Sequence, residues 1–120
     1  MDQYRATWAR EHGGKQTTKL CVARHVYVAD IQDAADEIAE RTYAAWYENF
    51  INLWRKFDVE DPACASTLET ARERDAIIAG TPDMVASEIE RQIEAAGLNY
   101  FVCRFAYGDL SSEEPGASFE

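Results

Sequence analysis

Two apolar segments of the chain predict β-strands. The first, Leu20 to Ala29, is rich in β-branched and aromatic residues, contains no glycine or proline, and is flanked by turn-forming residues. The second, Tyr100 to Ala106, has the same character and ends at Gly108. Both segments are apolar at nearly every position. This pattern is typical of strands covered on both faces, as in a parallel α/β sheet.

The residues between these two segments repeat with helical spacing. Apolar side chains recur about every four residues from Ile38 to Phe57, which predicts a long helix with Asp30 as its N-cap. At 1.5 Å per residue this aromatic-rich helix would be about 40 Å long. Because this length exceeds that of the helices that usually surround a parallel α/β barrel, we expect an insertion, a break or a second role for the helix.

Shorter helices are predicted elsewhere from their capping residues. Residues 66–69 have capping-box spacing and start a helix that reaches about Arg74. Thr81 and Pro82 open the next helix, and Gly97 closes it. Two further segments carry helical signals: residues 2–12, and a final capping box at residues 111–114. Residues 76–79 could either finish the preceding helix or form a short buried strand.

Charge and cysteine content exclude several classes of function. Asp and Glu number 22 against 12 Lys and Arg, for a net charge of −10, which argues against nucleic-acid and anionic-membrane partners. No run approaches the ~18 apolar residues of a membrane-spanning helix, and residues 1–10 do not resemble a signal peptide. The three cysteines are widely spaced, so we expect reduced thiols in a cytoplasmic protein and no metal site.

Strands that alternate with helices indicate parallel βαβ units. Two or three parallel strands are too few to form a covered sheet of their own, so the pattern indicates a segment of something larger. The exposed strand edges must then be covered. We therefore expect a homo-oligomer or a complementary chain, with the aromatic stripe of the long helix as a second contact surface.

A joint motif occupies residues 80–111. It begins with Gly80-Thr81-Pro82, continues through a helix ending Glu94-Ala95-Ala96-Gly97, and leads by an apolar strand into Gly108-Asp109-Leu110-Ser111. This pattern resembles the C-terminal portion of the bacterial luciferase-like, flavin-dependent monooxygenases, which show G-[ST]-P, E-A-G and G-D-L-[ST] at these places. Residues 24–30 and 46–47 also resemble members of that family.

The resemblance implies a (β/α)8 (TIM) barrel, which takes about 250 residues or more. This chain would be a partial barrel fragment with two or three parallel strands and the long aromatic-rich helix. Residues 76–79 would then be a barrel strand, residues 1–114 one domain, and residues 115–120 a flexible tail. The family's N-terminal strands and catalytic histidine have no counterpart here, so we name no catalytic residue and expect the chain alone to be inactive.

The resemblance also implies FMN as the cofactor and the oxygenation of a small organic substrate. In barrels, ligands meet the carboxyl ends of strands and the loops that follow. The candidate cofactor-binding residues at these positions are Gly80, Thr81, Arg104, Tyr107 and Asp109.

Each candidate residue also has a structural interpretation. Thr81 could hold a phosphate at a helix N-terminus or simply cap its own helix. Asp109 could bond backbone amides in its turn. Arg104 could face a flavin or an anionic substrate, or pair with a carboxylate. His25, in the middle of a strand, is interpreted as a hydrogen-bonded structural histidine. The alternative to a flavin enzyme is a non-catalytic, self-associating module of the same family.

Overall fold

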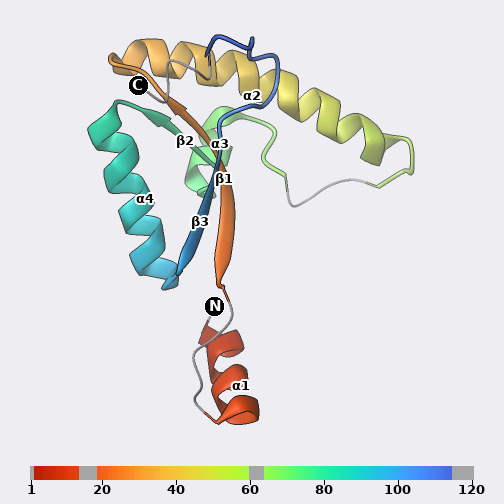
Figure 1. Cartoon of the computed structure of the whole chain (residues 1–120). Coiled ribbons are helices and arrows are strands. Elements are labelled where there is room, and N and C mark those ends of the chain that lie inside the picture. Colours follow the sequence, from red (N-terminus) through yellow and green to blue (C-terminus); the bar gives the residue numbers. More distant parts are fainter. Residues whose placement is uncertain (1, 14–18, 60–63, 115–120) are drawn as a thin grey trace.

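The computed structural model of the chain describes residues 2–13, 19–59 and 64–114, and the predicted tail at residues 115–120 lies outside them. Helices and strands alternate through most of this length (Figure 1). In chain order the elements are α1 (Asp2–His12), β1 (Cys21–Val28), α2 (Gln32–Arg55), α3 (Leu68–Glu73), β2 (Ile77–Gly80), α4 (Pro82–Ala96) and β3 (Tyr100–Arg104).

The strands form one parallel sheet in the order β2-β1-β3. His25 of β1 lies level with Ile77 of β2 on one side and with Arg104 of β3 on the other. The expected α/β class with parallel strands is therefore confirmed. The ambiguous segment at residues 76–79 contributes to strand β2, because the chain turns at Asp75 (φ 56°) before entering the sheet.

The strand order places helices on both faces of the sheet. Helix α2 connects β1 to β2 in one direction, whereas α4 connects β2 to β3 in the opposite direction, across β1. Right-handed crossovers in opposite directions put their helices on opposite faces. In a barrel, successive strands pair in chain order and all helices lie outside, so the expected barrel fragment is not confirmed by this arrangement.

Each face of the sheet has its own apolar core. One core joins the sheet to α2 and α3, and its buried members include Tyr27, Ala39, Tyr43, Leu68 and Ile77. The other core joins the sheet to α4 through Val26, Ile78 and Val85. The period-two alternation of strand side chains explains this division, because neighbouring residues of β1 and β2 point to opposite faces.

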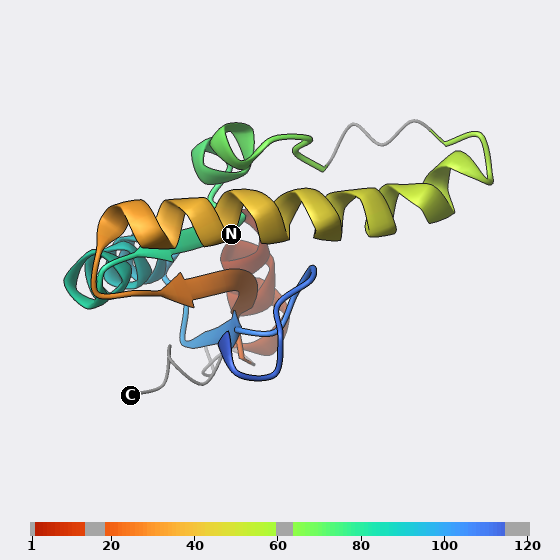
Figure 2. The same cartoon turned by 90° about the horizontal axis from the view of Figure 1, so that it is seen from above.

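Helix α2 is continuous over 24 residues, about 36 Å at 1.5 Å per residue, without the break that was one of the expectations. Its N-cap is Ile31, which makes no side-chain capping bond, so the prediction of Asp30 as N-cap is wrong. Figure 2 shows the carboxyl-terminal part of α2 extending past the sheet. Its aromatic stripe is therefore only partly covered, and Phe57 just beyond the helix is 72% exposed.

Local capping signals place several other helix ends. Thr67, rather than the Ser66 that the capping box of residues 66–69 indicated, is the N-cap of α3, and it accepts a bond from the amide of Thr70. Gly97 closes α4 in the left-handed conformation that glycine favours, with φ 57°. Ser111 and Glu114 exchange side-chain to backbone bonds, as their capping-box spacing predicts.

Helix α1 lies beyond the amino end of β1 (Figure 1) and has no buried residue. Arg5 joins it to α4 by donating to the carbonyl oxygens of Ala96 and Gly97, where the helix end carries partial negative charge. None of the helices within the described ranges combines the length and apolarity that crossing a bilayer requires.

Candidate functional site

A histidine lies at the centre of the sheet, on the face covered by α2. His25 occupies the middle of β1 and is 2% exposed. Aromatic rings surround it: the ring centroids of Tyr43, Trp46 and Tyr107 lie 6.4, 4.7 and 4.4 Å from that of the imidazole. Two of these residues come from α2 and the third from the loop after β3. Two segments distant from each other in sequence therefore enclose one polar ring of β1.

Neither ring nitrogen of His25 has a hydrogen-bond partner among the described residues. Burial, and to a lesser extent the nearby Arg104 guanidinium, lowers the pKa of His25 to about 4. The imidazole is therefore neutral at pH 7, with one N–H donor and one acceptor nitrogen. The sequence-based interpretation of His25 as a hydrogen-bonded structural histidine is wrong for the part of the chain that the structure describes.

A cavity of about 220 Å³ adjoins this histidine. Its aromatic wall is formed by Tyr43 and Trp46 of α2, and the Tyr43 hydroxyl donates to the carbonyl oxygen of Ala65 at 2.8 Å. The rest of the lining, within the described ranges, is Ala23, Arg24, His25, Cys64, Ala65, Arg74, Ala76 and Arg104. These lining residues include three arginines and no carboxylate.

The arginines at this cavity differ in how they are held. The Arg24 Nε donates to Gln92 Oε1 at 2.9 Å, and burial lowers the pKa of Arg24. Arg104 ends β3 level with His25, and it makes no ion pair with any carboxylate of the described residues. Of the two sequence-based interpretations of Arg104, pairing with a carboxylate is not observed among the described residues.

Tyr107, another predicted site residue, lies beside His25 rather than in an exposed loop. It is 7% exposed, and burial raises the pKa of its hydroxyl. The next residue, Gly108, has φ 63° and lies against the backbone of Thr42 in α2, where an added Cβ would be 2.0 Å from the Thr42 carbonyl oxygen. This close approach fixes the loop on α2 and the Tyr107 ring against His25.

Gly80 and Thr81 lie on the other side of β1, at the end of β2. A Cβ at Gly80 would lie 2.8 Å from Gln32 Oε1, so the side chain of Gln32 already fills the space above this glycine. Thr81 is the N-cap of α4, but its side chain makes no capping hydrogen bond. The interpretation of Thr81 as a side-chain cap is therefore wrong, although its predicted position is correct.

Asp109 belongs to a surface ion-pair network. Its carboxylate lies 2.7 Å from the Arg41 guanidinium, which also contacts Glu114. Hydrogen bonding to Asp109 raises the pKa of Arg41, and the backbone and side-chain bonds from Ser111 lower the pKa of Glu114. The carboxylate of Asp109 thus faces a cation of the same chain, and we assign it a role in holding the loop after β3 on α2.

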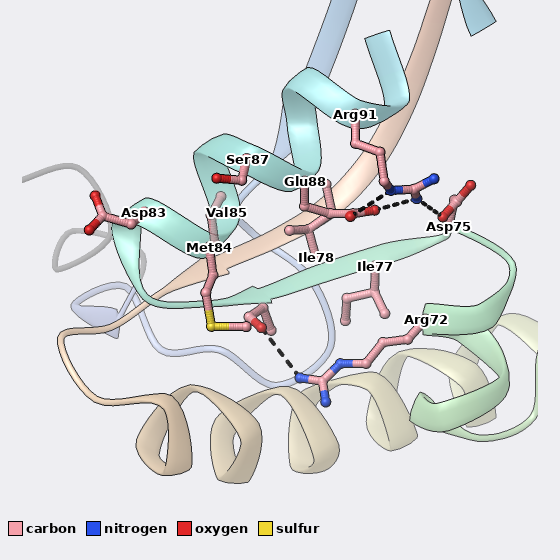
Figure 3. Close-up of a pocket in the computed structure, with 11 residues that line it drawn as sticks. Arg72, Asp75, Ile77, Ile78, Asp83, Met84, Val85, Ser87, Glu88 and Arg91 are labelled. Carbon is pink, nitrogen blue, oxygen red and sulfur yellow. Dashed lines mark hydrogen bonds and ion pairs between the residues drawn. The ribbon is translucent and has the colours of Figure 1, made fainter. Parts of the chain in front are cut away.

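A second hollow follows the outer edge of β2, between this strand, α4 and the side chain of Arg72 (Figure 3). It measures about 650 Å³ and is open to solvent. Arg91 contacts both Asp75 and Glu88 along one rim. Arg72 donates to the carbonyl oxygen of Ala79 at 3.4 Å, so one backbone group of the edge is already bound.

Sequence reasoning identified Arg104 and Tyr107 but missed the aromatic residues that complete the site. Trp46 was assigned to the apolar stripe of the long helix, and Tyr43, three residues before it, was not singled out. No local sequence pattern indicates that this face of the helix packs over His25 of β1. One signal was available in the sequence of the two strands. His25 lies at the centre of one and Arg104 at the end of the other, and these two residues are neighbours across the sheet.

Comparison with known proteins gives one informative match. No protein-family model matches the chain. The uncharacterized protein y4wF of Sinorhizobium fredii is 29% identical to it over 92 residues, which are 76% of this chain and 27% of that relative. The chain therefore spans about a quarter of the length of the curated relative it matches. A segment of this kind occurs within a longer polypeptide.

Proposed function

We propose that this chain corresponds to the carboxyl-terminal part of a flavin-dependent monooxygenase of the luciferase-like class. The observation that carries the proposal is the motif of residues 80–111, which coincides with the β2-α4-β3 unit: Gly80 ends the strand, Thr81 is the N-cap, and Gly97 ends the helix. The match within a relative of much greater length supports the idea that such a unit works as part of a larger protein.

The predicted FMN residues do not form a complete cofactor site on this chain. Gly80 ends β2 and Thr81 follows it, whereas Arg104 and Tyr107 lie on or after β3, and β1 separates the two strands. The cavity beside His25, at about 220 Å³, is smaller than the usual 300–1,000 Å³ of ligand pockets. It does not accommodate the three-ring isoalloxazine with its ribityl phosphate. We therefore propose no chemical step through a flavin for the isolated chain.

A titration and a chimera test this proposal together. Oxidised FMN added to the purified chain is expected to show no saturable binding below about 1 mM, a free energy weaker than roughly −4 kcal/mol. Full-length y4wF is expected to bind FMN. So is a chimera in which this chain replaces the 92 matched residues. A colourless y4wF, or a chimera that loses the flavin its parent retains, contradicts the flavin assignment. Micromolar FMN binding by the chain alone contradicts the incomplete site.

The open edge of β2 favours a second function of a different class, a non-catalytic module that associates with a copy of itself. The carbonyl oxygens of Ala76 and Gly80 accept bonds from β1, so the backbone groups of Ile77 and Ala79 point to the opposite, outer edge. A two-fold axis at Ile78 would pair these groups with those of a second chain, and the Ala79 carbonyl oxygen would exchange its bond from Arg72 for one from the partner strand. Strand edges that lack a neighbouring strand recruit further strands.

Light scattering across a concentration series tests self-association. Met84 lines the hollow beside β2 and is 53% exposed, so Met84→Lys places a charge in the proposed contact. We expect this variant to weaken dimerisation at least tenfold, about 1.4 kcal/mol. The matched control is Tyr4→Lys, which alters an exposed apolar residue of α1, at the opposite end of the sheet. A monomeric wild-type chain, or equal weakening by both variants, contradicts association through this edge.

A further inference from the structure

The polar groups enclosed beside α2 need an explanation that packing does not provide. Only 2% of the surface of His25 is exposed, and neither ring nitrogen forms a hydrogen bond with a described residue. A buried donor or acceptor without a partner costs about 1–3 kcal/mol, so an apolar residue of similar shape would pack here at lower cost. Buried groups of this kind mark places where a ligand or water completes the hydrogen bonding.

The cavity beside His25 provides room for such a ligand. Its volume of about 220 Å³ exceeds the 150 Å³ or so of a cavity that holds benzene, and it falls below the size of drug-like pockets. Trp46 and Tyr43 give it an aromatic wall, against which a flat ring can stack or pack edge-on. Size and wall together favour a single-ring molecule.

The charge of the lining selects an anion. The chain has a net charge of −10, yet the described residues around this cavity include three arginines and no carboxylate. The Arg24 side chain is bound to Gln92 of α4, on the opposite face of the sheet from His25, so the positive charge beside His25 comes from Arg74 and Arg104. Arg104 lies level with His25 across the sheet, and both residues line the cavity from adjacent strands. Guanidinium groups bind carboxylates through paired, charge-assisted hydrogen bonds.

We propose that this cavity is a binding site for a small aromatic carboxylate. The ring of the ligand lies against Trp46 and Tyr43, and its carboxylate accepts hydrogen bonds from Arg104 and from His25. The proposal stands apart from the flavin assignment, because it needs neither a cofactor nor the rest of a barrel. If the chain does belong to a flavin enzyme, small aromatic carboxylates are the class of organic molecule that its carboxyl-terminal part recognises.

Calorimetric titration of the purified chain with sodium benzoate tests this site, with tryptophan fluorescence as a second readout. We expect saturable one-to-one binding with a Kd below about 1 mM at pH 7 and low salt. Benzyl alcohol, which keeps the ring and lacks the charge, is expected to bind at least tenfold more weakly. Arg104→Gln is expected to weaken benzoate binding at least tenfold and to leave benzyl alcohol binding unchanged.

Two further variants make the result specific. Arg55→Gln removes an exposed arginine that pairs with Glu48 on α2, and benzoate binding is expected to be unchanged. His25→Phe keeps the shape of the ring without its nitrogens, and a folded variant by circular dichroism is expected to lose benzoate binding. The proposal is overturned if benzoate does not saturate below 10 mM, if benzyl alcohol binds equally well, or if Arg104→Gln and Arg55→Gln behave alike. Because Arg104 is exposed, its variant carries the test even if His25→Phe does not fold.

Discussion

Replacing Gly108 by alanine is expected to lower the free energy of unfolding by about 3 kcal/mol, the largest effect that we expect at any glycine the structure describes. Gly108 has φ 63°, a conformation that costs an L-residue about 1–2 kcal/mol. The added Cβ would also lie 2.0 Å from the Thr42 carbonyl oxygen and 2.8 Å from its carbon. Thr42 is fully buried within α2, so neither backbone can move without disturbing the core.

Gly13 provides a matched control for this substitution. Its φ of 64° is almost the same, but an added Cβ would meet nothing within 4 Å. Gly13→Ala should therefore cost only the backbone term, about 1 kcal/mol. Urea unfolding of both variants measures the difference. Equal losses in the two variants would show that the contact between Gly108 and α2 does not hold the loop that carries Tyr107.

Acidification from pH 7 to pH 5 is expected to lower the free energy of unfolding by about 2 kcal/mol through His25 alone. The pKa of His25 is about 4 in the folded chain against 6.5 as its ordinary value, because burial and then Arg104 disfavour the charged ring. Between these values the unfolded chain binds a proton that the folded chain does not. Stability is therefore full above about pH 6.5, falls as the pH drops towards 4, and levels off below.

Urea unfolding at a series of pH values, with two variants, isolates this contribution. His25→Phe is expected to remove most of the loss between pH 7 and pH 5, whereas His12→Gln, which alters the other, exposed histidine, should retain it. The bond to Arg91 lowers the pKa of Glu88 from 4.5, and Ser111 lowers that of Glu114. These carboxylates stay ionised in this range. A wild-type slope in His25→Phe would mean that other groups cause the acid sensitivity.

Local chemistry predicted the elements that depend on a few neighbouring residues. The segments around β1 and β3 were correctly predicted as parallel strands from their composition, and Gly97 was correctly placed at the end of α4. The expected burial of both faces is wrong for β3, which has no buried residue and lies at one edge of the sheet. The reciprocal bonds of Ser111 and Glu114 also followed from spacing, whereas the cap of α3 is Thr67, one residue after the Ser66 that the capping box of residues 66–69 indicated. The start of α2 did not, because Ile31 at its N-cap offers no polar side chain and Asp30 was the more obvious candidate.

The candidate site shows where this local reasoning ends. Arg104 and Tyr107 were predicted for a cofactor at the carboxyl end of strands, and they instead lie around His25 on one face of the sheet. Gly80 and Thr81 were predicted for the same cofactor and lie beyond β1. The residue types indicated candidate site residues, but the sequence did not show which of them lie together. That grouping depends on which strands are neighbours in the sheet.

Composition and periodicity were thus sufficient to identify an acidic α/β chain, its parallel strands and most of its helix ends, because these depend on contacts within a few residues. Strand order, the burial of His25 beneath α2 and the gathering of arginines at one cavity depend on contacts between segments far apart in the chain. The same apolar strands could pair in several orders with little difference in local energy. Only packing both faces of the sheet at once, with α2 and α4 on opposite sides, selects the order that brings His25 and Arg104 together.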